Sequence, residues 1–159
     1  MTAAAHQSGE PAMDIRIRLG AGEVINLTGT LTTLGGINAR PEAIAAAAEI
    51  MACGVDMVEL QAAASRIIAK VTGAEAGFVS ACSSAGICMA IAGAMTGDEA
   101  AAIAQLPDTQ GLKNKVAIQT GHLVDYGHSI VQDIRLTGAR AVTVGAVNHA
   151  SPAQLAAAL

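Results

Sequence analysis

The chain has 159 residues, of which 52% are hydrophobic, and it carries a formal net charge of −4. This length and apolar content are enough for one compact core, so a single domain is expected. The negative charge excludes the usual electrostatic basis of RNA or DNA binding, which depends on clustered lysine and arginine, and we expect no nucleic-acid partner. Aromatic residues are limited to Phe78 and Tyr126, which favours alanine-rich helices packed on a sheet over a β-sandwich.

The cysteines and the N-terminus predict a cytoplasmic protein. Cys53, Cys82 and Cys88 form no CxxC pair, and an odd number of such cysteines is typical of a reduced compartment. The polar N-terminus lacks the basic cluster and apolar run of a signal peptide. The longest uncharged run, residues 76–97, is interrupted by serines and leaves about a dozen apolar residues, fewer than the ~20 that span a bilayer. We therefore expect a core helix there and no membrane partner.

The first third of the chain is expected to contain little regular structure before its first helix. Residues 1–13 are expected to form a disordered leader, and Asp14–Leu19 alternates apolar and charged residues as a half-exposed strand does. Val24–Leu27 is a second extended piece, and Thr28–Gly36 is rich in hydroxyls and glycine, as loops are. We assign residues 1–23 to an N-terminal leader and strand.

Two helices follow, each with a recognisable start or end. Pro41 suits the first turn of a helix that runs to about Ala52. Asp56 and Glu59 have the spacing of a capping box ahead of a second helix, whose apolar residues fall on one face. Gly73 is expected to end that helix.

The remaining chain alternates strands and helices. Ala76–Val79 is predicted to be a short strand, and a helix follows from about Ala85 to Gly97. Asp98 is expected to cap another short helix, which Pro107 breaks. The later elements are a strand at Val116–Thr120, a helix at Ser129–Thr137, a strand at Ala141–Val147 and a helix that begins at Ser151. This alternation predicts an α/β fold with a mostly parallel sheet covered by helices.

The turn Ser80–Gly86, here called the small-residue turn, is the best candidate for a ligand site. It has no bulky side chain, and a helix that begins there would direct its free N–H groups and the positive end of its dipole at a ligand. Ser83 and Ser84 would add hydroxyl donors, so a phosphate group fits this description. The alternative is that Ser83 or Ser84 only caps a core helix.

A second candidate site is Gly121–His128, which comes just after a predicted strand, where open α/β sheets bind ligands. His122, Asp125 and His128 suggest a metal site, but their spacing spreads the side chains over a helix surface and no fourth ligand stands out. A nucleophilic triad of His122 with a serine or cysteine of the small-residue turn would need a G-x-S-x-G elbow, which the sequence lacks. An imidazole that stacks on a planar ligand suits the segment better.

Several short motifs, in order along the chain, carry a resemblance to a known family. They are Ile25-Asn-Leu-Thr-Gly29, Val58-Glu-Leu60, Thr72-Gly-Ala-Glu-Ala76, Gly121-His-Leu-Val-Asp-Tyr-Gly127 and Thr137-Gly-Ala-Arg140, with Val144-Gly145 and Asn148. Together they resemble the N-terminal half of the selenocysteine-synthase-like family of pyridoxal 5'-phosphate (PLP) enzymes. The chain looks closer to the D-glucosaminate-6-phosphate ammonia-lyase type than to L-seryl-tRNA(Sec) selenium transferase, because few residues precede the first motif where the transferase carries a tRNA-binding domain.

The resemblance implies a fold, an activity and a cofactor. It implies that residues 24–159 are the incomplete N-terminal part of a PLP-binding large domain of fold type I, the aspartate-aminotransferase-like fold, with helices on both faces of its sheet. The activity implied is that of a PLP-dependent lyase or transferase that eliminates ammonia or a β-substituent from a small-molecule amino acid or amino sugar. The full-length protein would be a homo-oligomer.

The resemblance also implies roles for individual residues. Those that would cradle the cofactor phosphate are Cys82, Ser83, Ser84 and Ala85. His122 would stack on the pyridine ring. Asn26, Thr28 and Gly29 would lie near the mouth of the active site.

The residues that perform the family's chemistry have no match in this sequence. Family members hold PLP as a Schiff base on a lysine and pair its pyridine nitrogen with an aspartate, and both are expected beyond Leu159. The chain's lysines are Lys70, Lys113 and Lys115, and none lies at the matching place. We therefore expect the front part of a longer enzyme. The alternative is a catalytically inactive α/β fragment that at most binds a phosphorylated small molecule.

Overall fold

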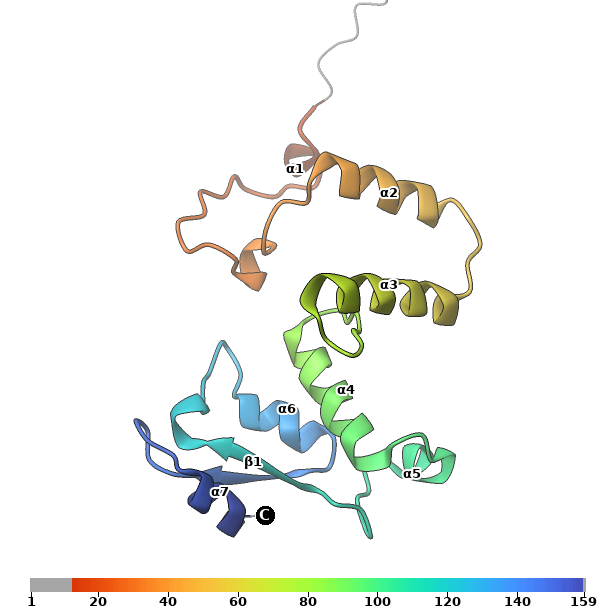
Figure 1. The fold of residues 1–159 in the computed structure, drawn as a ribbon. Coiled ribbons are helices and arrows are strands. Elements are labelled where there is room, and N and C mark those ends of the chain that lie inside the picture. The colour runs from red at the N-terminus through yellow and green to blue at the C-terminus, as the bar shows by residue number, and fades with distance from the viewer. Residues whose placement is uncertain (1–12, 159) are drawn as a thin grey trace, which may run out of the picture. The chain divides into compact units, whose positions relative to one another are not determined.

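The computed structural model describes residues 13–158. The chain divides after Gly54 into two compact units, which we describe separately (Figure 1), whereas its length alone predicted one domain. The helices of the first unit contain no buried residue. The predicted leader lies outside the described residues except for Met13, and the boundary predicted at residue 24 stays a prediction.

The first unit consists of short helices joined by irregular chain. Its elements are α1 (Ile15–Arg18), the 3-10 helix η1 (Thr32–Leu34) and α2 (Pro41–Met51). The prediction of a strand at Asp14–Leu19 is wrong, because Asp14 caps a helix: its carboxylate accepts a hydrogen bond from the Arg16 backbone N–H at 2.8 Å. The extended piece Val24–Leu27 forms no strand pairing.

The predicted starts and ends of α2 and of α3 (Met57–Thr72) are confirmed. Pro41 occupies the first position of α2. Asp56 caps α3, since its carboxylate accepts hydrogen bonds from two backbone N–H groups of the first turn at 2.8 and 3.0 Å. Gly73 ends α3 with φ of 74°, a left-handed conformation that glycine adopts without strain. Local capping chemistry therefore sets both ends of the longest helix.

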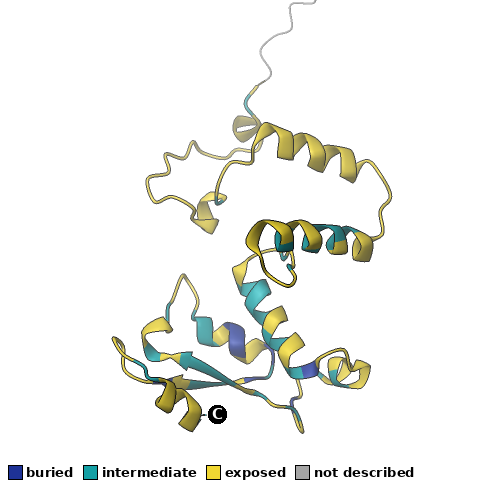
Figure 2. Ribbon diagram, in the orientation of Figure 1, coloured by how far each residue is buried: buried dark blue, intermediate teal, exposed yellow. Residues whose placement is uncertain are grey.

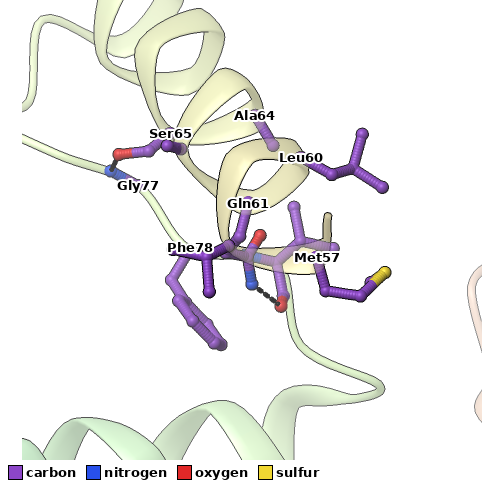
Figure 3. Close-up of a pocket in the computed structure, with 10 residues that line it drawn as sticks. Met57, Leu60, Gln61, Ala64, Ser65, Gly77 and Phe78 are labelled. Carbon is purple, nitrogen blue, oxygen red and sulfur yellow. Dashed lines mark hydrogen bonds between the residues drawn. The ribbon is translucent and has the colours of Figure 1, made fainter. Parts of the chain in front are cut away.

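The strand predicted at Ala76–Val79 is wrong, because side chains of α3 take the place of a partner strand (Figure 3). The Gln61 amide donates from Nε2 to the Val79 carbonyl at 2.7 Å and accepts from the Val79 N–H through Oε1 at 3.3 Å. Ser65 Oγ accepts a hydrogen bond from the Gly77 N–H at 3.0 Å. The segment is extended, but a helix satisfies its backbone groups and no sheet forms.

The helix after the small-residue turn is confirmed as α4 (Ser83–Thr96), and it begins slightly before the predicted Ala85. The short helix after it is α5 (Ala100–Gln105), which ends before the proline, as predicted. The cap of α5 is Glu99 and not the predicted Asp98, because the extended backbone before the helix, with φ of −73° and ψ of 107°, falls at Glu99.

The C-terminal part of the chain forms a two-stranded parallel sheet with helices against it (Figure 1). Its elements are β1 (Lys115–Gln119), the 3-10 helix η2 (Thr120–His122), α6 (Ile130–Leu136), β2 (Arg140–Val144) and α7 (Pro152–Ala158). Lys115 lies opposite Arg140 in the register, and α6 and α7 both pack against β2. The second strand ends at Val144, short of the predicted Val147, because Gly145 adopts φ of 74° and the chain turns back.

Most of the buried residues lie on α6 or between α6 and the end of β2, and Thr96 at the end of α4 and Thr109 are also buried (Figure 2). The buried apolar residues among 13–158 are Ile134, Ala139 and Val144. Many larger apolar side chains stay exposed, including Phe78 at 55% and Met89 at 50%. A mixed α/β architecture with a small parallel sheet is confirmed. Helices on both faces of a larger sheet, and fold type I, stay predictions.

No helix within residues 13–158 combines the length and the apolar character needed to cross a membrane.

Candidate anion-binding site

The N-terminus of α4 presents backbone N–H groups that nothing else in the described chain uses. Its cap residue is Cys82, which has an extended backbone and makes no side-chain cap bond. The first hydrogen bond inside the helix joins the Gly86 N–H to the Cys82 carbonyl at 3.0 Å. Within residues 13–158, the N–H groups of Ser83, Ser84 and Ala85 therefore have no partner. Neither serine caps the helix, which contradicts the alternative that Ser83 or Ser84 only caps a core helix.

The small-residue turn is held closed by a short hydrogen bond of its own. Ser80 Oγ donates to the Cys82 carbonyl at 2.9 Å. A Cβ placed on Gly86 would lie 3.1 Å from Ser80 Oγ, which is tighter than ordinary packing. The turn thus has little space for larger side chains. Its hydrogen bond fixes the direction of the first turn of α4 and leaves the N–H groups of that turn uncovered.

A histidine and a buried carboxylate complete the site from another part of the chain. Ser84 Oγ lies 2.9 Å from His128 Nε2, and the same nitrogen lies 3.0 Å from Asp133 Oδ1. Asp133 is 2% exposed, and its second oxygen, Oδ2, has no hydrogen-bond partner among the described residues. His128 is partly exposed, with 41% of its side chain accessible. Ser84 meets His128 and Asp133 only because α4 packs against α6 in the fold.

Neither of these two residues is predicted from sequence as part of the anion site. His128 is considered only as a metal ligand, and Asp133 in the first turn of α6 resembles an ordinary acid at a helix start. The spacing of Ser84 and Asp133 along the chain carries no local signal that could have linked them.

Cys88, on α4, contacts the backbone of Asp133. Its Sγ donates to the Asp133 carbonyl at 3.3 Å. Burial raises the pKa of Cys88, and the nearby charge of Asp133 raises it further. The thiolate that nucleophilic chemistry needs is therefore disfavoured at this position.

His122 lies at the end of η2, directly after β1, and lines a different hollow. This cavity has a volume of ≈ 360 Å³, and Gly121, Asn148 and His149 also line it. A Cβ on Gly121 would overlap the Val147 carbonyl, so only glycine fits beside His122. No hydrogen bond among residues 13–158 links His122 to the small-residue turn, and its predicted stacking role stays a prediction.

Two of the three residues considered for a metal site, Asp125 and His128, have other partners. Asp125 Oδ1 accepts a hydrogen bond from the Gly127 N–H at 2.8 Å, which closes a tight turn, and His128 faces Ser84. In the part of the chain that the structure describes, no three His, Cys, Asp or Glu side chains gather as metal ligands do.

A larger hollow lies along α3 but offers little chemistry. It has a volume of ≈ 780 Å³ and lies between α3 and the extended segment with Phe78 and Val79 (Figure 3). Its lining includes no charged side chain; Gln61 and Ser65 are its polar members, and both already bond the segment. The end of α4 is therefore the better candidate for binding a charged group.

The turn Asn26–Gly29 has a structural explanation within the first unit. Asn26 Nδ2 donates to the Gly29 carbonyl at 2.6 Å, and Asn26 Oδ1 accepts from the Thr28 N–H at 2.9 Å. These bonds define the turn, and the predicted place at the mouth of an active site stays a prediction.

Fold and site together define an α/β protein with a candidate anion site at a helix N-terminus. No family model matches the chain. The chain is 38% identical over 142 residues to D-glucosaminate-6-phosphate ammonia lyase of Salmonella typhimurium (strain 14028s / SGSC 2262), a match that covers 89% of this chain and 38% of that protein. A solved structure of D-glucosaminate-6-phosphate ammonia-lyase matches with a TM-score of 0.86 and 37% identity, over 94% of this chain and 40% of the solved one.

A second relative has a different named activity. It is 5'-C-glycyluridine monooxygenase-decarboxylase of Streptomyces sp, which is 32% identical over 154 residues, covering 96% of this chain and 38% of that protein. The chain thus spans 38% to 40% of the length of the proteins it matches. These matches confirm the resemblance to the ammonia lyase. Membership of the selenocysteine-synthase-like family and of the PLP enzymes stays a prediction.

Proposed function

We propose that this chain forms the phosphate-binding part of a PLP-dependent lyase that acts on an amino sugar or an amino acid. The observation that carries the proposal is the uncapped N-terminus of α4, where Ser83, Ser84 and Ala85 offer three unpaired N–H groups. Homology to an ammonia lyase whose named substrate is an amino sugar phosphate supports the reaction class. Cytoplasmic location and homo-oligomer formation belong to the same proposal.

The donor set of the turn suits a phosphate group. Three unpaired backbone N–H groups and two serine residues lie at one end of a helix of 14 residues, and the partial positive charge at that end favours an anion. The N–H groups of Ser83, Ser84 and Ala85, with Cys82 as the cap residue, would hold the phosphate without requiring a lysine or an arginine. His122 would orient the cofactor by stacking on its ring.

PLP, when bound, supplies the electron sink that makes removal of the substrate's α-proton possible. The described residues would contribute binding and orientation to such chemistry. Lys70 lies in the last turn of α3, Lys115 begins β1, and Lys113 precedes β1 by two residues, so none of the three lysines belongs to the small-residue turn. We propose that the lysine that holds the cofactor lies outside this sequence.

The second candidate function is a catalytically inactive α/β fragment that at most binds a phosphorylated small molecule. The extent of exposed apolar surface, including Phe78 and Met89, favours this candidate for the 159-residue chain by itself. The two candidates differ in whether the site recognises the pyridine ring as well as the phosphate.

The test uses pyridoxine 5'-phosphate, an alcohol analogue of PLP that cannot form an imine with any lysine. Equilibrium dialysis should show saturable binding, and replacing both Ser83 and Ser84 with alanine should weaken it by ~1–3 kcal/mol, because two hydroxyl donors are lost while the backbone N–H groups remain. Ser151→Ala is the matched control: it removes a hydroxyl at the start of α7, where Ser151 Oγ accepts from the Gln154 N–H at 3.2 Å, and should leave binding unchanged.

Two results would count against the proposal. Equal affinity in the double serine variant and the wild type would remove the small-residue turn from the site. Equal affinity for pyridoxine 5'-phosphate and inorganic phosphate would favour the second candidate, because the ring would then contribute nothing.

A further inference from the structure

The arrangement of Ser84, His128 and Asp133 restricts where the imidazole proton can be. Ser84 Oγ and Asp133 Oδ1 both lie within hydrogen-bond distance of one ring nitrogen, His128 Nε2, at 2.9 and 3.0 Å. A single ring nitrogen offers either one N–H or one lone pair. A carboxylate oxygen accepts hydrogen bonds, and only an N–H can donate to it from the ring. The contact with Asp133 Oδ1 therefore places the hydrogen on Nε2.

This assignment determines what the Ser84 hydroxyl can do. Nε2 has one hydrogen, so Asp133 Oδ1 and Ser84 Oγ share it as the two acceptors of a three-centre bond, and the hydroxyl hydrogen of Ser84 is free to point elsewhere. Ser84 is the second residue of α4, beside the unpaired N–H groups of Ser83 and Ala85. A donor in that place adds to the donors that face an anion.

The same geometry excludes a nucleophilic serine. A catalytic base must present an unprotonated nitrogen to the hydroxyl, and the orienting carboxylate must bond the other ring nitrogen. Here the carboxylate and the hydroxyl meet the same nitrogen. Ser84 is thus arranged as a hydrogen-bond donor and not as a nucleophile.

The carboxylate of Asp133 is buried, and it bonds His128. Asp133 is 2% exposed and its Oδ2 has no partner within residues 13–158, and a buried acceptor without a partner is costly. The nearby Cys88 thiol bonds the backbone carbonyl of Asp133 and leaves the carboxylate alone. His128 is then the one side chain that the carboxylate bonds in the described structure.

We propose that Asp133 and His128 are positioning residues for anion binding: Asp133 keeps a proton on His128 Nε2, and this N–H fixes Ser84 with its hydroxyl hydrogen directed at a phosphate on the N-terminus of α4. The inference rests on the proposed function, because it concerns the same phosphate site. It adds two residues from α6 and the loop before it to a site otherwise built from α4.

The first test locates the proton in the ligand-free chain. Long-range ¹H–¹⁵N NMR spectra should show His128 Nε2 protonated. In Asp133→Asn, whose amide offers a donor as well as an acceptor, the form protonated only on Nδ1 should gain population. A bare Nε2 in the wild type, or a tautomer ratio unchanged by Asp133→Asn, would overturn the inference.

The second test compares two substitutions of His128 by titration with inorganic phosphate. His128→Gln keeps an N–H near the position of Nε2, whereas His128→Phe keeps the ring shape and loses the donor. We expect Gln to retain most of the phosphate affinity and Phe to weaken it by roughly threefold or more, while Ser84→Ala weakens it by roughly tenfold. A role in packing alone predicts the reverse order, because Phe fills the space of the imidazole better.

A double-mutant cycle separates this inference from the proposed function. In the Ser84→Ala background, His128→Phe should have no further effect on phosphate affinity, since His128 acts through the lost hydroxyl. Suppose that the wild type binds phosphate and that Ser84→Ala weakens this binding. If His128→Gln and His128→Phe then have equal phosphate affinity, or if the effect of His128→Phe adds to that of Ser84→Ala, the inference is wrong and the proposed function stands. If the wild type shows no saturable binding of inorganic phosphate or of pyridoxine 5'-phosphate, both fall.

Discussion

The loss of folding stability caused by close packing at the turn into β2 can be measured by comparing two glycines that have the same backbone angle. Gly138 and Gly111 both have φ of 82°. A Cβ on Gly138 would overlap the Pro107 carbonyl and lie 2.9 Å from Thr109 Cγ2, whereas a Cβ on Gly111 would meet nothing within 4 Å. Gly138→Ala and Gly111→Ala therefore share the backbone strain and differ in the overlap.

The magnitude follows from these two contributions. Placing an alanine in the left-handed region costs ~1–2 kcal/mol, and forcing an extra methyl group into a filled space costs ~1–3 kcal/mol. Thr109 cannot move freely, because its Oγ1 donates to the Gly138 carbonyl at 3.0 Å. We expect Gly138→Ala to lower the free energy of unfolding by about 2–5 kcal/mol and Gly111→Ala by about 1–2 kcal/mol.

Urea denaturation of both variants, followed by circular dichroism, measures the difference directly. The change in the unfolded chain is the same for both glycine-to-alanine substitutions, so it cancels in the comparison. Equal destabilisation of the two variants would refute the close approach of Gly138 to Pro107, and with it the tight turn that places α6 and β2.

Three further predictions concern single contacts. The side-chain hydrogen bond from Arg16 lowers the pKa of Asp14 to about 2, from an ordinary value of 3.8. The stabilisation of α1 by this pair should therefore be complete above pH 3.8 and be lost as the pH falls through about 2. An NMR titration of Arg16→Gln should show the Asp14 pKa returning upward. His122→Phe should keep most of the affinity for pyridoxine 5'-phosphate, while His122→Ala should lose ~0.5–1.5 kcal/mol in equilibrium dialysis; equal losses would contradict stacking. Gln61→Ala should speed hydrogen exchange at the Val79 N–H, which the Gln61 amide holds at 3.3 Å; unchanged protection would show that another group covers it.

The sequence by itself determined the elements whose signals are local. The ends of α3 follow from Asp56 and Gly73, which act within one turn of the helix they bound. The start of α4 follows from a turn of small residues, and the unpaired N–H groups there are a consequence of any helix start that lacks a side-chain cap. These features require no knowledge of what packs against them.

The tertiary structure decided the elements that need a partner. A strand is defined by its neighbour, and the strands predicted at Asp14–Leu19 and Ala76–Val79 have none: the first becomes a capped helix, and the second is held by side chains of α3. The site shows the same division. Ser84 could be identified from its own turn, but the contact between Ser84 and His128 joins residues 44 positions apart and depends on α4 packing against α6. No local pattern encodes such a contact, because it arises only when two helices meet.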